Sequence, residues 1–253
     1  MVRWLNSTLG RGIGFFIVLE LMLVPAVLYW PDFSKHIGKF RALAPLPVMR
    51  GIIDTLETGG AFAYVTGQHF FKGCNTLGVA AAVLLSVGAI AGEAHRGTLE
   101  IFLARPISRA RLLTERYVEG ALAVCLPVFL STLTIPALLE HIGEKLTYGP
   151  LLWSALHTNL LLLAIYSLGF FLSTLSRTPL AIAFGLLFFT ILQFALYLVE
   201  RVTHWSLFRL TDVERFLEIQ KRGGLDPKYW LPLAGVSLAL YIASLRAFAR
   251  RTP

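Results

Sequence analysis

The sequence predicts an all-α polytopic membrane protein with six transmembrane helices and a short cytoplasmic helix between the second and third. Of its 253 residues, 56% are apolar and 15% are charged, and the mean hydropathy is +0.67. A soluble domain of this length would need more charged residues to cover its surface. Six apolar runs reach the roughly 20 residues that a helix needs to cross the hydrocarbon. The alternating pattern of a membrane barrel is absent, which leaves helices as the spanning elements.

The apolar runs place the six spans and leave two long outer loops. The expected spans cover about residues 12–29, 74–92, 118–139, 151–174, 180–199 and 231–247. The outer loops cover about residues 31–72 and 200–229. Neither an internal repeat nor a low-complexity tract occurs in the sequence, so we expect a single transmembrane domain over residues 1–253.

Each outer loop contains one expected short helix. In the first loop it covers about residues 48–56. In the second loop, Thr211 or Asp212 can cap the helix and Gly223 can end it, because short polar side chains cap helix starts and glycine accepts the left-handed conformation that ends them. This second helix either lies on the outer leaflet or is an ordinary loop helix.

The charge distribution sets the expected topology. The net charge is +8, and Lys and Arg are densest at the two termini and in the polar segment between the second and third spans. Because cytoplasmic flanks of membrane proteins are enriched in Lys and Arg, we expect both termini and this segment in the cytoplasm. Anionic lipid explains the basic balance. No basic stripe with interleaved aromatic residues occurs, so no nucleic-acid partner is expected.

The polar segment, residues 92–116, holds five arginines and three glutamates between two apolar runs. Glu93 with Arg96, and Arg96 with Glu100, have the spacing of ion pairs that stabilise a helix. Gly97 allows a bend between the two pairs. The pattern therefore predicts a helix, a sharp turn and a second short helix.

The second short helix covers residues 98–103. Pro106 ends it, because a proline disfavours the α conformation in the residue before it. Ser108 can then cap the helix that continues into the third span. A short charged element that is held between two spanning helices can receive a push from another protein.

Two further features lie within the spans. Gly88 and Gly92 form a small-xxx-small pattern at the inner end of the second span, which lets another helix approach closely, either within the chain or in a dimer. Glu20 lies near the middle of the first span, where a carboxylate costs free energy. It is either a satisfied contact between helices or part of a polar path for a substrate.

The polar segment carries a family resemblance. The pattern Glu93-x-x-Arg96-Gly97-Thr98-Leu99-Glu100-x-x-Leu103-x-x-Pro106-Ile107-Ser108-Arg109 resembles the hallmark of ABC-2 type permeases, the six-span membrane subunits of bacterial ATP-binding-cassette transporters. The resemblance implies that residues 93–109 form a coupling helix region that docks in a groove of an ATPase. By matched position, the ATPase-coupling residues are Glu93, Arg96, Gly97, Thr98, Glu100, Pro106, Ser108 and Arg109. The first outer loop is longer than in compact members, so the resemblance does not indicate the substrate.

The resemblance also implies a function and its partners. It implies a permease in the bacterial inner membrane that couples ATP hydrolysis by a separate ATPase subunit to substrate movement, expected as export. The implied partners are two ATPase copies, a second copy of this chain or a related permease, the lipid bilayer and an optional periplasmic protein. The sequence has no Gly-x-x-x-x-Gly-Lys-Ser/Thr phosphate loop and no catalytic motif, so we do not expect an enzyme. ATP and Mg²⁺ are expected in the partner ATPase, and the scattered histidines predict no metal site.

Two alternative functions stay open. The first is a mechanotransmission subunit that moves no solute and relays ATPase motion to a periplasmic partner through the outer loops. A sealed, apolar dimer seam would favour that alternative, and a polar cavity would favour transport. The second is a stand-alone channel or secondary carrier, which would need several paired polar residues near mid-membrane, and apart from Glu20 the spans offer few.

Overall fold

In the computed structural model of the chain, residues 2–45, 47–104 and 106–250 are described, and their regular elements are all helices. In chain order these are α1 (Val2–Leu43), α2 (Pro47–Thr66), the π-helix η1 (Gly67–Gly78), α3 (Val79–Ala89), α4 (Ala91–His95), α5 (Leu99–Leu103), α6 (Arg109–His141), α7 (Tyr148–Leu175), α8 (Pro179–Leu198), the 3₁₀ turns η2 (Thr203–Trp205) and η3 (Leu207–Thr211), α9 (Val213–Arg222) and α10 (Pro227–Ala249). Within these ranges, six helical stretches are long and apolar enough to cross a membrane, namely residues 8–43, 49–89, 109–141, 148–175, 179–198 and 227–249. The predicted fold class is confirmed.

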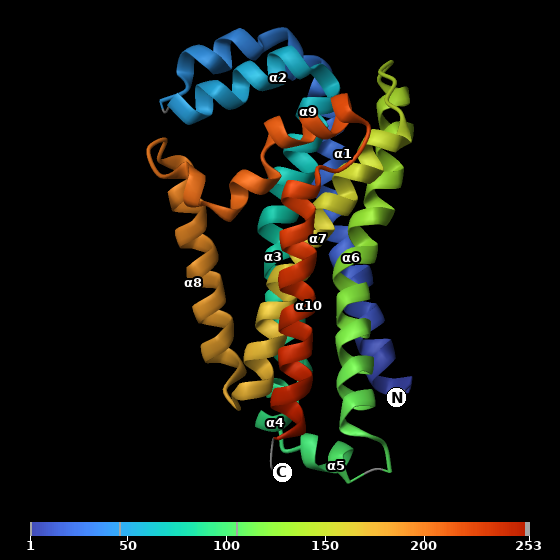
Figure 1. Cartoon of the computed structure of the whole chain (residues 1–253). Coiled ribbons are helices and arrows are strands. Elements are labelled where there is room, and N and C mark those ends of the chain that lie inside the picture. Colours follow the sequence, from blue (N-terminus) through green and yellow to red (C-terminus); the bar gives the residue numbers. More distant parts are fainter. Residues whose placement is uncertain (1, 46, 105, 251–253) are drawn as a thin grey trace.

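The helices form an upright bundle with different structures at its two ends (Figure 1). α7 packs against α3, α6 and α10, and α1 packs along α6. α4 and α5 lie at the end of the bundle that also holds both chain ends, which we call the inner end. α2 and α9 lie at the opposite, outer end, and α8 packs on α3 and α7 while it splays away from the bundle in Figure 1.

Glycines let the central helices approach closely. A Cβ at Gly120 on α6 would lie 2.2 Å from the Tyr166 hydroxyl of α7, and one at Gly169 on α7 would lie 2.1 Å from the Ser86 hydroxyl of α3. The Tyr166 ring is fully buried, and its hydroxyl donates a hydrogen bond to the Tyr117 carbonyl at 3.1 Å. Small residues at such crossings are typical of helix packing in membranes.

Residues 31–72, which the sequence predicts to be an outer loop with one short helix, are almost entirely helical. Pro31 lies inside α1, and the helix predicted at 48–56 is the first half of α2, which bends at Gly60 (φ 58°, ψ −148°). Tertiary packing explains the difference: the rings of Trp30 and Phe33 each lie 4.9 Å from the ring of Tyr64 on α2. These aromatic contacts stabilise the pairing of α1 with α2, so α1 stays helical beyond residue 29, the expected end of the first span.

The expected helix in the second outer loop is confirmed as α9. Asp212 accepts a hydrogen bond from the Arg215 N–H at 3.0 Å, and Gly223 ends the helix with φ 70°. The apolar residues Val213, Phe216 and Ile219 are buried, and α9 packs on α2 and α7. Its apolar side therefore covers protein, which supports the ordinary loop helix and not one lying on the outer leaflet.

Candidate functional site

The inner turn, residues 93–109, begins where the second span ends. α3 stops at Ala89, and Ile90 leaves the helical conformation with φ −122° and ψ −54°. The hydroxyl of Ser173 on α7 accepts hydrogen bonds from the N–H groups of Ile90 at 3.3 Å and Ala91 at 2.7 Å. Because a helix break leaves buried N–H groups without their usual acceptors, Ser173 stabilises the break and ties it to α7.

The chain then reverses at Gly97, which has φ +69°. The Thr98 N–H donates to the Glu93 carbonyl at 3.0 Å, and the Gly97 N–H donates to the Ala94 carbonyl at 3.2 Å. These two bonds form a Schellman motif, in which a glycine in the left-handed conformation ends a helix. The bend that the sequence predicts at Gly97 is therefore present, with a defined hydrogen-bond pattern.

The Glu93 carboxylate holds this turn together. Its side chain is only 8% exposed, and it accepts a hydrogen bond from the Arg96 guanidinium at 2.9 Å and another from the Thr98 hydroxyl. Burying a carboxylate costs free energy unless it is paired and hydrogen-bonded. The two donors satisfy that requirement only in the folded turn, so they favour a single shape.

The second expected ion pair, between Arg96 and Glu100, is wrong. In the described ranges Glu100 has no ion-pair partner, and Arg96 pairs with Glu93 alone. The cause is the turn itself, because the left-handed Gly97 separates the two residues into different helices. Residues four apart face each other only on one continuous helix.

The predicted short helix is present as α5, which covers Leu99–Leu103 where the sequence predicts residues 98–103. Leu99 is buried and packs in the core of the bundle, whereas Glu100 and Ile101 are exposed. A helix of five residues is not stable alone. The Leu99 contact and the preceding turn therefore fix α5, and its other side is open to a partner.

The exit from the inner turn is capped as predicted. α5 ends before Pro106, and Arg105 lies outside the described residues. Ser108 has an extended backbone (φ −68°, ψ 143°), and its hydroxyl accepts a hydrogen bond from the Arg111 N–H at 3.2 Å. Ser108 is therefore the N-cap of α6.

Arg109 adds a contact that the sequence does not predict. Its guanidinium donates to the carbonyl of Ala249, the last residue of α10, at 3.1 Å. Cations are stabilised near the carbonyl end of a helix. This contact connects the start of the third span to the end of the sixth.

Gly88 and Gly92 are not sites of close helix packing within this chain. A Cβ at Gly88 would meet no atom within 4 Å, and the nearest atom to one at Gly92 would be the Arg96 guanidinium at 3.8 Å. The close approaches occur at Gly120 and Gly169 instead. The packing role of Gly88 and Gly92 stays a prediction, now for a contact outside this chain.

Glu20 makes a contact between helices. The Thr134 hydroxyl of α6 donates a hydrogen bond to the Glu20 carboxylate of α1 at 2.9 Å. A hydrogen bond of this kind lowers the cost of placing a carboxylate in a span. This geometry favours the satisfied contact that the sequence analysis names, and the role in a polar path stays a prediction.

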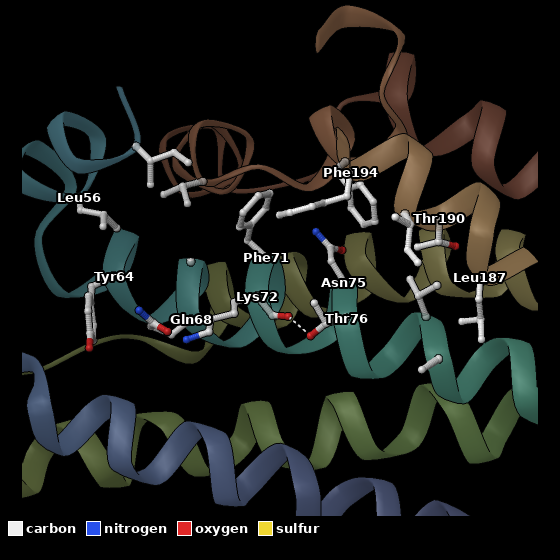
Figure 2. A pocket seen from close by; sticks show the side chains of 17 residues that line it. Leu56, Tyr64, Gln68, Phe71, Lys72, Asn75, Thr76, Leu187, Thr190 and Phe194 are labelled. Carbon is white, nitrogen blue, oxygen red and sulfur yellow. Dashed lines mark hydrogen bonds between the residues drawn. The ribbon is translucent and has the colours of Figure 1, made fainter. Parts of the chain in front are cut away.

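A second candidate site, which the sequence analysis missed, is a cavity near the outer end of the bundle (Figure 2). We call it the outer cavity. Its volume is about 530 Å³, and its walls come from α2, η1, α3, α8, η3 and α9. The polar residues Gln68, Lys72 and Thr76 recur every four positions along its wall, and this spacing was the signal in the sequence. Treating residues 31–72 as a loop concealed it.

Metal-ligand geometry is not found in the described ranges. No group of three or more His, Cys, Asp or Glu residues there could hold a metal ion. The inner turn is a charged protein surface, in which the side chains of Arg96 and Thr98 are hydrogen-bonded to Glu93 and one side of α5 is exposed.

Comparison with known proteins identifies the family. A family model described as ABC-2 family transporter protein matches residues 38–218. The chain belongs to this family. No curated protein and no solved structure matches the chain. The matched range contains the whole inner turn and the residues around the outer cavity.

Membership establishes the general role of the chain. ABC-2 family proteins are membrane components of transporters that work with ATPase partners, and they are generally not catalytic themselves. Together with the six apolar helices, the match makes this chain a multi-pass membrane protein of the ABC permease type.

Proposed function

We propose that this chain is the permease subunit of an ATP-binding-cassette transporter and that a separate ATPase drives it through the inner turn. The observation that carries the proposal is the inner turn between the second and third spans, which is held by its own hydrogen bonds and exposes one side of α5. Glu100 and Ile101 on α5 are exposed, while Leu99 on the same helix is buried in the bundle. An ATPase that docks on α5 would therefore push on a surface fixed to the spans.

Three contacts support transmission of this push to several spans. Leu99 packs into the core, Ser173 of α7 holds the break at the end of α3, and Arg109 at the start of α6 holds the end of α10. Packed side chains and hydrogen bonds of this kind are the physical carriers of coupling between distant parts of a protein. A displacement of the inner turn would act on α3, α6, α7 and α10 together.

The proposed assembly contains two ATPase copies and two permease chains, which are identical or related. ATP and Mg²⁺ bind in the ATPases. The inner end faces the cytoplasm of a bacterial cell, which the density of Lys and Arg there supports. Both chain ends lie at that end of the bundle, as an even number of spans requires (Figure 1). Export is the proposed direction of transport.

Charge reversal on α5 tests the proposal. The chain is purified with its partner ATPase, and the variant Glu100→Arg with Ile101→Arg is compared with Glu57→Arg, which changes an exposed residue of α2 at the outer end. We expect the α5 variant to lose at least about tenfold in ATPase binding and stimulation, because interface charge reversal costs several kcal/mol. The melting temperature of both variants should stay unchanged. Normal binding and stimulation by the α5 variant would overturn the proposal.

One observation favours the mechanotransmission alternative. α1 has 42 residues, and at 1.5 Å per residue it is roughly 63 Å long, about twice the thickness of the hydrocarbon. Its outer part and α2 form a helical hairpin at the outer end, where a periplasmic partner could bind (Figure 1). A mechanotransmission subunit needs no open cavity. The substitution Leu187→Trp, which fills the outer cavity, should therefore leave the activity of such a subunit in cells intact. A permease that uses the cavity should lose activity.

A further inference from the structure

The outer cavity combines a mainly apolar wall with several polar residues on η1 (Figure 2). Leu56, Tyr64 and Gln68 lie toward one end, Leu187 and Thr190 of α8 lie toward the other, and Lys72, Asn75 and Thr76 lie between them. Most of the remaining wall is apolar, with Phe71, Val79 and Ile191 among its residues. A ligand that matches this wall has one polar end and a longer apolar part, because binding pockets are mainly apolar with a few placed polar groups.

Lys72 supplies a positive charge without a counter-ion. In the described part of the chain, the Lys72 ammonium has no ion-pair partner. Lys72 is exposed, and a Lys near a membrane surface attracts anionic lipid headgroups. The charge therefore favours an anionic group beside Lys72.

Asn75 supplies a second donor in the same wall. Its side chain is 3% exposed, and its carbonyl oxygen accepts a hydrogen bond from the Thr211 hydroxyl at 3.1 Å. Its Nδ2 group is buried and has no hydrogen-bond partner. Buried donors are almost always satisfied, so an unpaired one that lines a cavity indicates a ligand acceptor or an ordered water.

The backbone of η1 presents these groups along one wall. A π-helix of 12 residues, Gly67–Gly78, carries Gln68, Lys72 and Asn75. Such i→i+5 segments are rare and frequently occur at functional sites. Here the wider helix lies where the second span borders the cavity.

The depth of the cavity matches the outer half of a bilayer. The α-helix α3, Val79–Ala89, is about 15 Å long at 1.5 Å per residue, which is about half of the roughly 30 Å hydrocarbon thickness. The cavity residues Val79 and Ala80 therefore lie near the middle of the membrane, where acyl chains lie. Lys72, which precedes them on η1, lies further toward the outer boundary of the hydrocarbon.

We propose that the outer cavity binds an anionic amphiphile, with its phosphate or carboxylate on Lys72 and Asn75 and its hydrocarbon chain between α3 and α8. This inference deepens the proposed function by naming a substrate class, and it rests on that function only for the export step. Binding itself is tested on the purified chain without the ATPase, so failure of one proposal is distinguishable from failure of the other.

The test measures lipid binding by native mass spectrometry in a neutral detergent. The probes are phosphatidylglycerol, phosphatidylcholine with the same chains, palmitate and inorganic phosphate. We expect phosphatidylglycerol and palmitate to bind at least about fivefold more tightly than phosphatidylcholine, since one Lys near the surface contributes about 1 kcal/mol. Lys72→Gln should remove this preference, whereas Lys35→Gln on the outer part of α1 should keep it.

A second pair of variants tests the apolar part of the site. Leu187→Trp fills the cavity and should weaken binding of all probes with chains by at least about tenfold, because one or two kcal/mol of steric conflict is enough. Phe184→Trp changes an exposed residue of α8 outside the cavity and should have no effect. Three outcomes would overturn the proposal: equal binding of the two phospholipids, a retained preference in Lys72→Gln, or Lys72-dependent binding of inorganic phosphate as tight as that of phosphatidylglycerol.

Discussion

The inner turn and the outer end of the bundle are stabilised in different ways. In the inner turn, the hydrogen bonds that close the reversal at Gly97 join residues at most five positions apart, as between Glu93 and Thr98. At the outer end, the defining contacts join distant segments. The indole N–H of Trp30 donates to the Glu144 carboxylate at 3.0 Å, and the Thr211 hydroxyl donates to the Asn75 side chain.

The inner turn is therefore held by local hydrogen bonds, and the outer end is held by packing between helices. A turn that is closed by its own hydrogen bonds can keep its shape while the whole element is pushed. A packed outer end changes only when several helices move together, because close-packed interfaces have discrete arrangements. The inner turn is therefore suited to receive a push as one rigid element. The walls of the outer cavity belong to different helices, so the cavity changes only when these helices move.

The largest expected effect is at the outer end. Trp30→Ala should reduce the free energy of unfolding by about 3–5 kcal/mol, because it removes a buried ring and a hydrogen bond to Glu144. Trp205→Ala, which removes an exposed indole, should change it by less than about 0.5 kcal/mol. Thermal unfolding in detergent measures both. Equal stability of the two variants would show that the aromatic cluster does not hold the helical hairpin.

A pH effect should also arise at the outer end. Burial raises the pKa of Asp212 to about 6, against the hydrogen bond from the Arg215 N–H and the charge of Arg209, which lower it. A carboxyl with a raised pKa binds its proton more tightly in the folded chain. Its contribution to stability is therefore fully present below pH 3.8 and is lost as the pH rises through about 6, by up to about 3 kcal/mol.

Asp212→Asn isolates this effect, because asparagine keeps the helix cap but cannot ionise. Melting temperatures between pH 4.5 and 7.5 should fall more steeply in the unmodified chain than in the variant. Asp226→Asn is the control, since hydrogen bonding from the Lys228 N–H lowers the pKa of Asp226 below its ordinary 3.8. Parallel pH profiles for the unmodified chain and Asp212→Asn would show that Asp212 does not cause the loss of stability with rising pH.

The smallest change in stability should accompany the substitution at the inner turn. Gly97→Val places a β-branched residue at φ +69°, which costs about 1–3 kcal/mol at this one position. Because the bundle core does not depend on Gly97, the turn should relieve this strain by a local change of shape. ATPase stimulation should therefore fall, while the melting temperature changes little. Gly97→Asn should retain both, since asparagine tolerates the left-handed conformation. Unchanged stimulation by Gly97→Val would show that the turn can change shape without consequence.

The same difference explains how much could be predicted from the sequence. The roles of Gly97, Ser108 and Gly223 can be predicted, because the chemistry of a turn or cap is contained in a few neighbouring residues. Pro31 misleads, because ring contacts across about thirty residues of sequence keep α1 helical through it. Local rules do not include such distant contacts.

The parts of the sites that could not be predicted share this cause. Ser173 reaches the break at Ile90 from another helix, and Arg109 reaches Ala249 from the far end of the sequence. The outer cavity forms only where η1, α3 and α8 meet. Each of these features depends on which helices are neighbours, and apolar periodicity alone does not determine that.

The solvent accessibility of α5 shows directly whether an ATPase docks on the inner turn. A single cysteine replaces Ile101 in a chain whose native Cys74 and Cys125 are changed to alanine, and its reaction rate with a maleimide is measured with and without the ATPase. We expect the ATPase to slow labelling at position 101 at least about tenfold, while a cysteine in place of Glu57 on α2 reacts at the same rate in both cases. Equal labelling of position 101 with and without a bound ATPase would show that the ATPase does not dock on α5.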